Sequence, residues 1–313
     1  MQGMELARRY YEAFGAPMLR EQFPQVEKLI AVGLTGSGSE CYGFDDAVSR
    51  DHDFEPGFCL FLPEEDLVDR RTEFLLERAY ARLPDSFEGF GRQKLQPVGG
   101  ARHGVHRLRT YYRERLGYAP DELTPLRWLA LPEEALAEAV NGAVFRDDAG
   151  RWTAWRELLR SMPEDVRRKK LAGHLLMMAQ SGQYNYLRCL RHGEQGAAQL
   201  AVGEYVRHAM AAAFLLRHET APYYKWQFRA LRRLEGMEDW ARSLEWLLTT
   251  DNGEKLAREK AFCMEGMAAE TGDMLREQGL STAEGDDLEK HAYAVNEGIE
   301  DGEIRNLHIL AAV

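Results

Sequence analysis

The hydrophobic pattern of the first 120 residues alternates between two periods. Apolar residues recur every three or four positions over 4–14 and 64–82, which predicts two amphipathic helices. Between them, residues 29–34 form a short apolar run, and residues 51–62 alternate polar and apolar positions before they become apolar. Both of these patterns predict strands. Strands that alternate with helices at this spacing predict a small α/β domain.

The pattern changes in the remainder of the chain. A third strand is predicted over residues 104–108, and the helix after it is expected to end at Gly117. The turn at 148–150 predicts one hairpin over 144–155. Beyond it the chain has an almost continuous helical pattern with short breaks, over residues 164–182, 195–218, 224–248, 254–278 and 286–300. We therefore predict an α/β domain over 1–120 and an all-α helical bundle over 121–313.

Composition and charge narrow the functional classes. The net charge of −11 argues against a broad basic surface for duplex nucleic acid, and it disfavours RNA without excluding it. The four cysteines lie far apart and lack a C-x-x-C spacing, which disfavours structural zinc and a disulfide framework. The sequence has no apolar run of about 18 residues, and residues 1–14 are amphipathic and charged. We therefore expect a cytoplasmic protein with no membrane contact.

The candidate chemistry lies between the first two predicted strands, in the sequence GSGSECYGFDDAVSRDHDF. In a strand, residues i and i+2 share a face, so Asp51 and Asp53 are expected to converge while His52 points away. Converging carboxylates repel unless a cation lies between them or one of them is protonated. Magnesium is the natural cation, because it binds to one or two carboxylates together with substrate phosphates. Small residues upstream let backbone N–H groups approach phosphate oxygens. The combination predicts a magnesium–triphosphate site.

Competing motifs fail on their spacing. A Walker loop requires G-K-[ST], and no lysine follows these glycines. A dinucleotide fingerprint that begins at Gly36 would require glycine where Cys41 stands. A calcium loop that begins at Asp51 would require glycine and glutamate where Pro56 and Leu62 stand. The serine-hydrolase elbow G-x-S-x-G is absent.

The pattern that remains resembles the DNA polymerase β-like nucleotidyltransferase superfamily. The Gly38-Ser39 pair, three further residues and a glycine are followed by S-x-D-x-D, which ends in Asp51 and Asp53. The resemblance implies that Gly38 and Ser39 contact the triphosphate and that the two aspartates bind Mg²⁺. Arg50 is inserted relative to the usual Ser-Asp-x-Asp, and we place it with the residues that contact the nucleotide. The implied fold is a small mixed sheet with helices, followed by the bundle.

The resemblance extends over residues 28–245. Segments such as RHGVHRLRTYYRERLG, SGQYNYLRCLRHGE and APYYKWQFRAL resemble a bacterial domain family of uncharacterised function that is grouped with these enzymes. Related kanamycin- and lincosamide-type nucleotidyltransferases use a basic residue of the helical region on the triphosphate. By that resemblance Lys225, at the start of a predicted helix, is the candidate. The alternative is a lysine that reaches solvent beside core aromatics.

One element of the superfamily pattern is missing. The third predicted strand usually supplies another carboxylate, but residues 104–108 contain no acid. His106 is the candidate general base there, because an unperturbed histidine titrates near neutral pH. A zinc pair with His103 is disfavoured, since residues i and i+3 face opposite sides of a strand. The missing acid leaves a catalytically degenerate, nucleotide-binding or regulatory module as the alternative function.

The leading hypothesis is a magnesium-dependent transfer of a nucleoside monophosphate from a triphosphate, with ATP favoured, to a hydroxyl or amine, with release of pyrophosphate. Tyr184, Asn185 and Arg188 fall within about one helical turn and are candidates for an acceptor pocket; the alternative is that they tie two helices together. The acidic helical half favours a cationic small molecule as acceptor, with a protein or RNA acceptor still open. A monomer and a homodimer are both compatible with the sequence.

Overall fold

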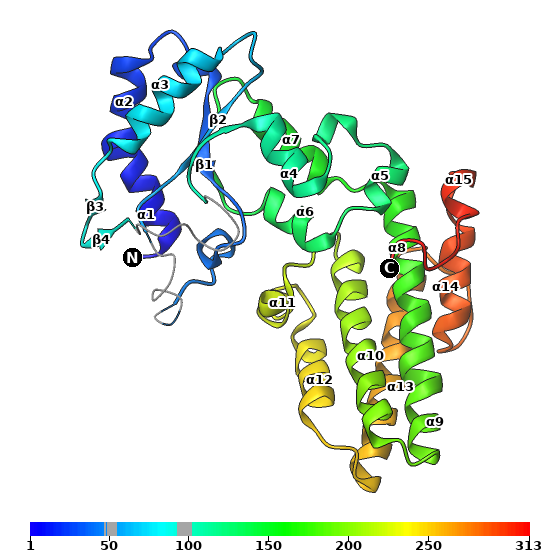
Figure 1. Ribbon diagram of the computed structural model, residues 1–313. Helices are drawn as coiled ribbons and strands as arrows, with labels where there is room; N and C mark the ends of the chain where they lie inside the picture. The colour runs from blue at the N-terminus through cyan, green and yellow to red at the C-terminus, as the bar shows by residue number, and fades with distance from the viewer. Residues whose placement is uncertain (47, 49–54, 93–101) are drawn as a thin grey trace. The chain divides into compact units, whose positions relative to one another are not determined.

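The computed structural model describes residues 1–46, 48, 55–92 and 102–313, and these form two compact units (Figure 1). The first, which we call the sheet unit, comprises residues 1–123 and 134–161. The second, the helical unit, comprises residues 124–133 and 162–313. A single boundary after residue 120 does not describe this arrangement. Residues 134–161 return to the first unit because they carry a strand that pairs with its sheet.

The sheet has four short strands in the order β5-β2-β1-β6. They are β1 (Ala31–Leu34), β2 (Cys59–Leu62), β5 (Gly104–Arg107) and β6 (Ala143–Arg146). Strand β1 is antiparallel to both β2 and β6, whereas β2 is parallel to β5, so the sheet is mixed. Strands near 29–34 and 104–108 are thus confirmed. The predicted second strand begins only at Cys59, and residues 51–54 of that prediction lie outside the described residues. A small hairpin, β3 (Ser86–Phe87) and β4 (Phe90–Gly91), stands apart.

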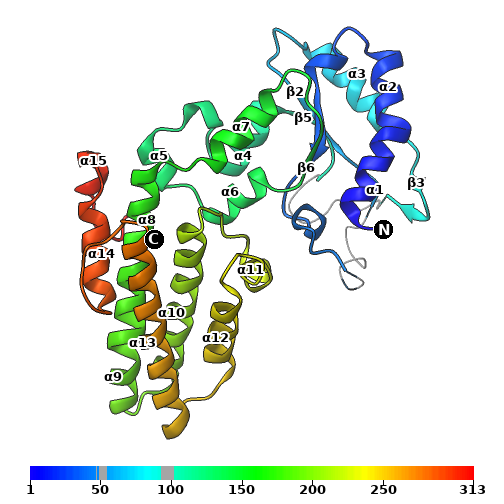
Figure 2. The same ribbon diagram turned by 180° about the vertical axis from the view of Figure 1, so that it is seen from behind.

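One face of the sheet packs on the N-terminal helices (Figure 2). These are α1 (Gly3–Tyr10), α2 (Ala16–Gln22) and α3 (Arg70–Ala81). Val32, Leu60 and Leu62 point to this face because they alternate with residues of the other face, and they pack with Tyr10 and Leu76. The predicted helices at 4–14 and 64–82 are confirmed, although α3 begins later, at Arg70, directly after its N-cap Asp69.

The opposite face is covered by α4 (Leu108–Leu116), α6 (Glu133–Val140) and α7 (Arg151–Arg160). Phe61 contacts Tyr111 and Trp152 there, with ring centroids 4.8 and 4.4 Å apart. The hairpin predicted over 144–155 is wrong in its second half. Strand β6 is followed by the helix α7, and the Asp147 carboxylate satisfies one N–H of its first turn by accepting from the Thr153 N–H at 2.7 Å.

The helical unit is a bundle around one large apolar core (Figure 1). Its longer helices are α8 (Glu164–Met178), α10 (Gln195–Leu216), α11 (Tyr224–Leu231), α12 (Glu238–Thr249), α13 (Glu254–Glu277) and α14 (Leu288–Glu297). The helix predicted over 224–248 is two helices: α11 ends at Leu231, and the connection to α12 contains Gly236, whose φ of 72° does not fit a helix. A π-helical segment, η5 (Ala179–Asn185), joins α8 to α9 (Tyr186–Arg191), and the short α5 (Pro125–Leu129) and α15 (Gly302–Arg305) complete the unit. Among the described residues, none of the helices has the length and apolarity needed to cross a bilayer.

Candidate functional site

The topology brings the Gly-Ser segment to one end of the sheet. Strand β1 ends there at Leu34, and because β1 and β2 are antiparallel, with Gly33 opposite Cys59, strand β2 begins at the same end. The parallel pairing of Cys59 with Gly104 adds the start of β5. We call this the loop end of the sheet, and residues 36–39 the Gly-Ser loop. Asp51, Asp53 and Arg50 precede β2 in the chain, and all three lie outside the described residues.

Glycine residues give the Gly-Ser loop a backbone conformation in which several N–H groups have no hydrogen-bond partner among the described residues. Gly36 has a φ of 130°, a conformation that other residues rarely adopt. Ser39 begins a 3-10 turn, η3 (Ser39–Tyr42), which ends at Gly43 with a φ of 62°. The backbone N–H groups of Ser37, Gly38 and Ser39 make no hydrogen bond to any described residue. Three adjacent N–H groups without a partner form the kind of concavity that binds an anion.

A segment that is distant in sequence holds this loop. The Asn141 side chain accepts from the Gly36 N–H at 2.9 Å and donates to the Gly36 carbonyl at 2.7 Å. The Thr35 hydroxyl donates to the Glu138 carbonyl oxygen at 2.7 Å and lies 3.0 Å from Asn141 Oδ1. The Gly142 N–H donates to the Cys41 carbonyl at 2.8 Å. The last turn of α6 and the residues after it therefore contact both sides of the Gly-Ser loop.

Two carboxylates lie close to the loop. The Glu40 carboxylate lies against Gly38, where a Cβ would collide with it. Glu138 is half-buried on α6, and burial raises the pKa of its carboxyl, with Glu134 adding to the shift and Arg115 and Arg102 opposing it. A triphosphate beside Glu40 would be repelled unless a cation lay between them.

His106 lies on β5, away from the loop. Its ring is 5.9 Å from the Phe61 ring and 5.5 Å from the Tyr111 ring, and its buried Nε2 has no hydrogen-bond partner among the described residues. Burial above all, then Arg115 and His103, lowers the pKa of His106 to about 4. A base this weak is poorly matched to neutral pH. The environment therefore argues against His106 as the general base.

The neighbouring histidine has a different partner. His103 Nδ1 lies 3.2 Å from the Glu55 carboxylate, at the loop end. This places His103 beside a carboxylate rather than in a zinc pair with His106. Within the described part of the chain, no group of three or more His, Cys, Asp or Glu side chains is arranged to hold a metal ion.

The candidate site residues of the helical unit do not all line one cavity. Tyr184 lines a cavity of about 560 Å³, together with Leu176, Ala179, Gln180, Gln183, Glu265, Asp286, Asp287 and Glu289. Asn185 and Arg188 are not among these lining residues; Arg188 instead donates to the Tyr184 hydroxyl at 2.6 Å. Lys225 is exposed on α11, with its ammonium 4.7 Å from the centroid of the Trp226 ring.

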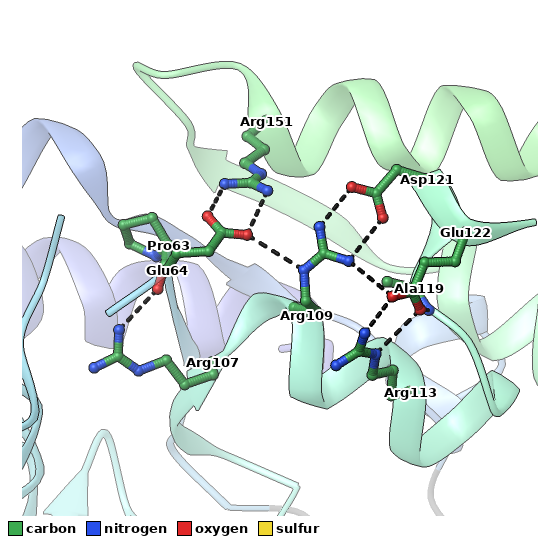
Figure 3. Close-up of polar contacts among 9 residues, drawn as sticks. All are labelled: Pro63, Glu64, Arg107, Arg109, Arg113, Ala119, Asp121, Glu122 and Arg151. Carbon is green, nitrogen blue, oxygen red and sulfur yellow. Dashed lines mark hydrogen bonds and ion pairs between the residues drawn. The ribbon is translucent and has the colours of Figure 1, made fainter. Parts of the chain in front are cut away.

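The opposite end of the sheet, where β2 and β5 end, carries an ion-pair network (Figure 3). Glu64 is bound by Arg151 and Arg109, and Arg109 also pairs with Asp121 at 2.6 Å. Glu122 pairs with Arg109 and Arg113. We call this the ion-pair end. Its acidic and basic groups satisfy one another, which is the behaviour of a structural network.

Sequence reasoning missed two residues of the loop end, Glu138 and Asn141. Their signal in the sequence is slight: Asn141-Gly142 terminates a helix immediately before a strand, and Glu138 precedes it by one turn. Nothing local connects either residue to the Gly-Ser loop, which lies about a hundred positions earlier. Only the β1–β6 pairing brings them together.

The comparisons with known proteins are sparse. Residues 128–227 match the model of a family described as "Domain of unknown function (DUF4037)", which is less than half of the chain. No curated protein matches the sequence. Among solved structures, a nucleotidyltransferase-like protein from Exiguobacterium sibiricum matches with a TM-score of 0.40 and 13% identity, over 84% of this chain and 79% of that chain. The match to a domain family of uncharacterised function thus covers residues 128–227, and a relation to antibiotic nucleotidyltransferases is not among these findings.

Proposed function

We propose that this protein is a nucleotidyltransferase that binds a nucleoside triphosphate, with ATP favoured by resemblance, at the loop end of its sheet. The observation that carries the proposal is the set of three unpartnered N–H groups at residues 37–39, held on a loop that follows a buried strand. These groups would contact phosphate oxygens, with the Ser39 hydroxyl as an additional donor. Arg50 and Lys225 are proposed by resemblance to contact the nucleotide.

The proposed metal ligands are Asp51 and Asp53. They precede β2 in the sequence, and β2 begins at the loop end. When bound, Mg²⁺ would neutralise the charge of the triphosphate and of the nearby carboxylates. Glu40, which lies against Gly38, is a further carboxylate that this charge would hold.

In the proposed reaction a hydroxyl or amine of the acceptor attacks the α-phosphorus. The new bond to phosphorus forms as the bond to the bridging oxygen breaks, and pyrophosphate leaves. The acceptor's proton must go to a base, and we propose Glu138 for this role in place of His106. Burial raises the pKa of Glu138, which brings it closer to the value that suits a base near neutral pH.

For the acceptor we propose a small cationic molecule. The cavity that Tyr184 lines carries four carboxylates, from Glu265, Asp286, Asp287 and Glu289, and no basic residue lines it. Its volume of about 560 Å³ lies within the range of small-molecule sites. Opposite charge and an aromatic wall both favour a protonated amine.

The test is magnesium-dependent binding and turnover by the full chain. Calorimetry with ATP, GTP, CTP and UTP should show tight binding with Mg²⁺ and weak binding in chelator, and Asp53→Asn should remove that difference. Asp46→Asn, a nearby exposed aspartate, serves as the matched control and should behave like wild type. Equal affinity in magnesium and in chelator would contradict the metal site. Binding without pyrophosphate release, across a panel of aminated and hydroxylated acceptors, would favour the alternative of a nucleotide-binding regulatory module.

A further inference from the structure

The contact between Asn141 and Gly36 imitates one rung of a β-ladder. Backbone pairing between β1 and β6 ends with Leu34 opposite Ala143. Beyond that point, the Asn141 amide takes the place of a strand: its Oδ1 accepts from the Gly36 N–H and its Nδ2 donates to the Gly36 carbonyl. The side chain therefore extends the pairing of β1 into the Gly-Ser loop.

The same segment closes the far side of the loop. The Gly142 N–H donates to the carbonyl of Cys41 in the η3 turn, and Gly142 has a φ of 69° that permits this close approach. A Cβ on Gly142 would overlap the Leu34 carbonyl. Residues 141 and 142 thus bind the backbone on both sides of residues 37–39, whose own N–H groups make no hydrogen bond to any described residue.

A contact of this kind reduces the conformational entropy that a glycine-rich loop would lose when it binds a ligand. Glycine loses more conformational freedom on ordering than any other residue, and the loop contains Gly36 and Gly38. A loop that is ordered only by its ligand would subtract that entropy from the binding free energy. Here the ordering is supplied during folding by Asn141, so the three N–H groups are held in place before a ligand arrives.

We propose that Asn141 is a positioning residue, which fixes the Gly-Ser loop in the shape that receives the phosphates. This role in binding rests on the proposed nucleotide site, whereas the restraint on the loop stands on the contacts alone. Asn141 is assigned no contact with the nucleotide or with the reacting atoms.

The experiment separates the restraint from the binding. Hydrogen–deuterium exchange of the ligand-free protein should be faster over residues 34–43 in Asn141→Ala, and also in Asn141→Asp, which keeps an acceptor but loses the donor. Asn252→Ala is the matched control, because the Asn252 amide also makes three hydrogen bonds, with Tyr186, Lys260 and Gln199, but lies in the helical unit. It should leave the exchange of residues 34–43 unchanged.

Nucleotide affinity provides the second measurement. With Mg²⁺, Asn141→Ala should bind triphosphate about tenfold more weakly or worse, as expected for the loss of restraint worth one or two hydrogen bonds. Unchanged exchange over 34–43 in both variants would overturn the proposal, whatever the protein binds. Faster exchange with undiminished affinity would overturn the positioning role. If wild type binds no triphosphate, the proposed function fails, but the exchange measurement still shows whether Asn141 restrains the loop. If Asn141→Ala does not fold, Asn141→Asp provides both the exchange and the affinity measurement.

Discussion

The two ends of the sheet differ in how their side chains interact: one end is linked by ion pairs, the other by hydrogen bonds between neutral groups. At the ion-pair end, the carboxylates of Glu64, Asp121 and Glu122 are paired with Arg109, Arg113 and Arg151 (Figure 3). At the loop end, the Gly-Ser loop is held by backbone groups and by the neutral amide of Asn141. The ion-pair end is thus stabilised by paired charges that neutralise each other. The Gly-Ser loop at the other end is held by hydrogen bonds between neutral groups.

The pKa values follow this difference. At the ion-pair end, the Arg113 hydrogen bond and the Ala119 N–H lower the pKa of Glu122 to about 2. Burial acts to raise the pKa of Glu64, but Arg151 and Arg109 outweigh it, so the pKa is lowered. At the loop end, burial raises the pKa of Glu138. Carboxylates with lowered pKa values stabilise the fold, whereas a carboxylate with a raised value is costly to ionise and is a candidate for chemistry.

The largest expected effect concerns Glu138. Glu138→Gln should lower turnover by about 10²–10⁴-fold, the usual contribution of general acid–base catalysis, with little loss of stability. The measurement is pyrophosphate release across pH, where the wild-type rate should rise as Glu138 loses its proton above the ordinary glutamate range and the variant should lack this step. Glu134→Gln, one turn earlier on the exposed side of α6, is the control and should retain activity. Equal rates in Glu138→Gln and Glu134→Gln would remove Glu138 from the mechanism.

The second prediction compares the two glycines that flank β6, one at each end of the sheet. Gly142 and Gly150 have nearly the same φ, 69° and 68°, but a Cβ would overlap the Leu34 carbonyl at Gly142 and would meet nothing within 4 Å at Gly150. Gly142→Ala should therefore cost about 2–4 kcal/mol of unfolding free energy, from both the backbone conformation and the overlap. Gly150→Ala should cost only about 1–2 kcal/mol, from the backbone conformation alone.

Chemical denaturation of the two variants measures the difference directly. Gly142→Ala should also accelerate hydrogen exchange of residues 34–43, because the Gly142 N–H holds Cys41. Equal losses of stability in both variants would show that the segment before β6 is no more tightly fitted than the turn after it.

The smallest effect is expected at the ion-pair end. Glu64→Gln should destabilise the protein by about 1 kcal/mol at neutral pH, because the pairs with Arg151 and Arg109 are about one-third exposed and therefore screened. Nucleotide binding should be unchanged. Glu65→Gln, which removes only an exposed pair with Arg70, is the control and should lose less.

The pH dependence of stability should distinguish the same pair of variants. The folded-state pKa of Glu64 lies below its ordinary value of 4.5, so its contribution is fully present above pH 4.5 and is lost as the pH falls through the lowered value. Glu64→Gln should therefore have a shallower fall in unfolding free energy below about pH 4.5 than wild type or Glu65→Gln. Parallel curves would mean that the network contributes nothing to acid stability.

Local pattern predicted the elements well where a single period persisted. The helices near 164–178, 195–216 and 254–277 follow the 3.6-residue repeat of their apolar residues, and β1 follows its apolar run. The prediction failed where two signals competed. After β6 the turn at 148–150 is compatible with a hairpin, but the spacing of Trp152, Trp155 and Leu159 favours a helix, and the Asp147 carboxylate accepts from the Thr153 N–H in its first turn.

The sequence by itself determined that a glycine- and serine-rich segment follows a buried strand and precedes two closely spaced aspartates, because these features are written in consecutive residues. The tertiary structure alone decided that Glu138 and Asn141 join that segment, that β6 belongs to the same sheet, and that His106 is enclosed by Phe61 and Tyr111. The physical reason is the range of the interactions. Helical and strand periods arise between neighbours in the chain, whereas strand pairing and the Asn141 contact join residues about a hundred positions apart, whose separation carries no local signal.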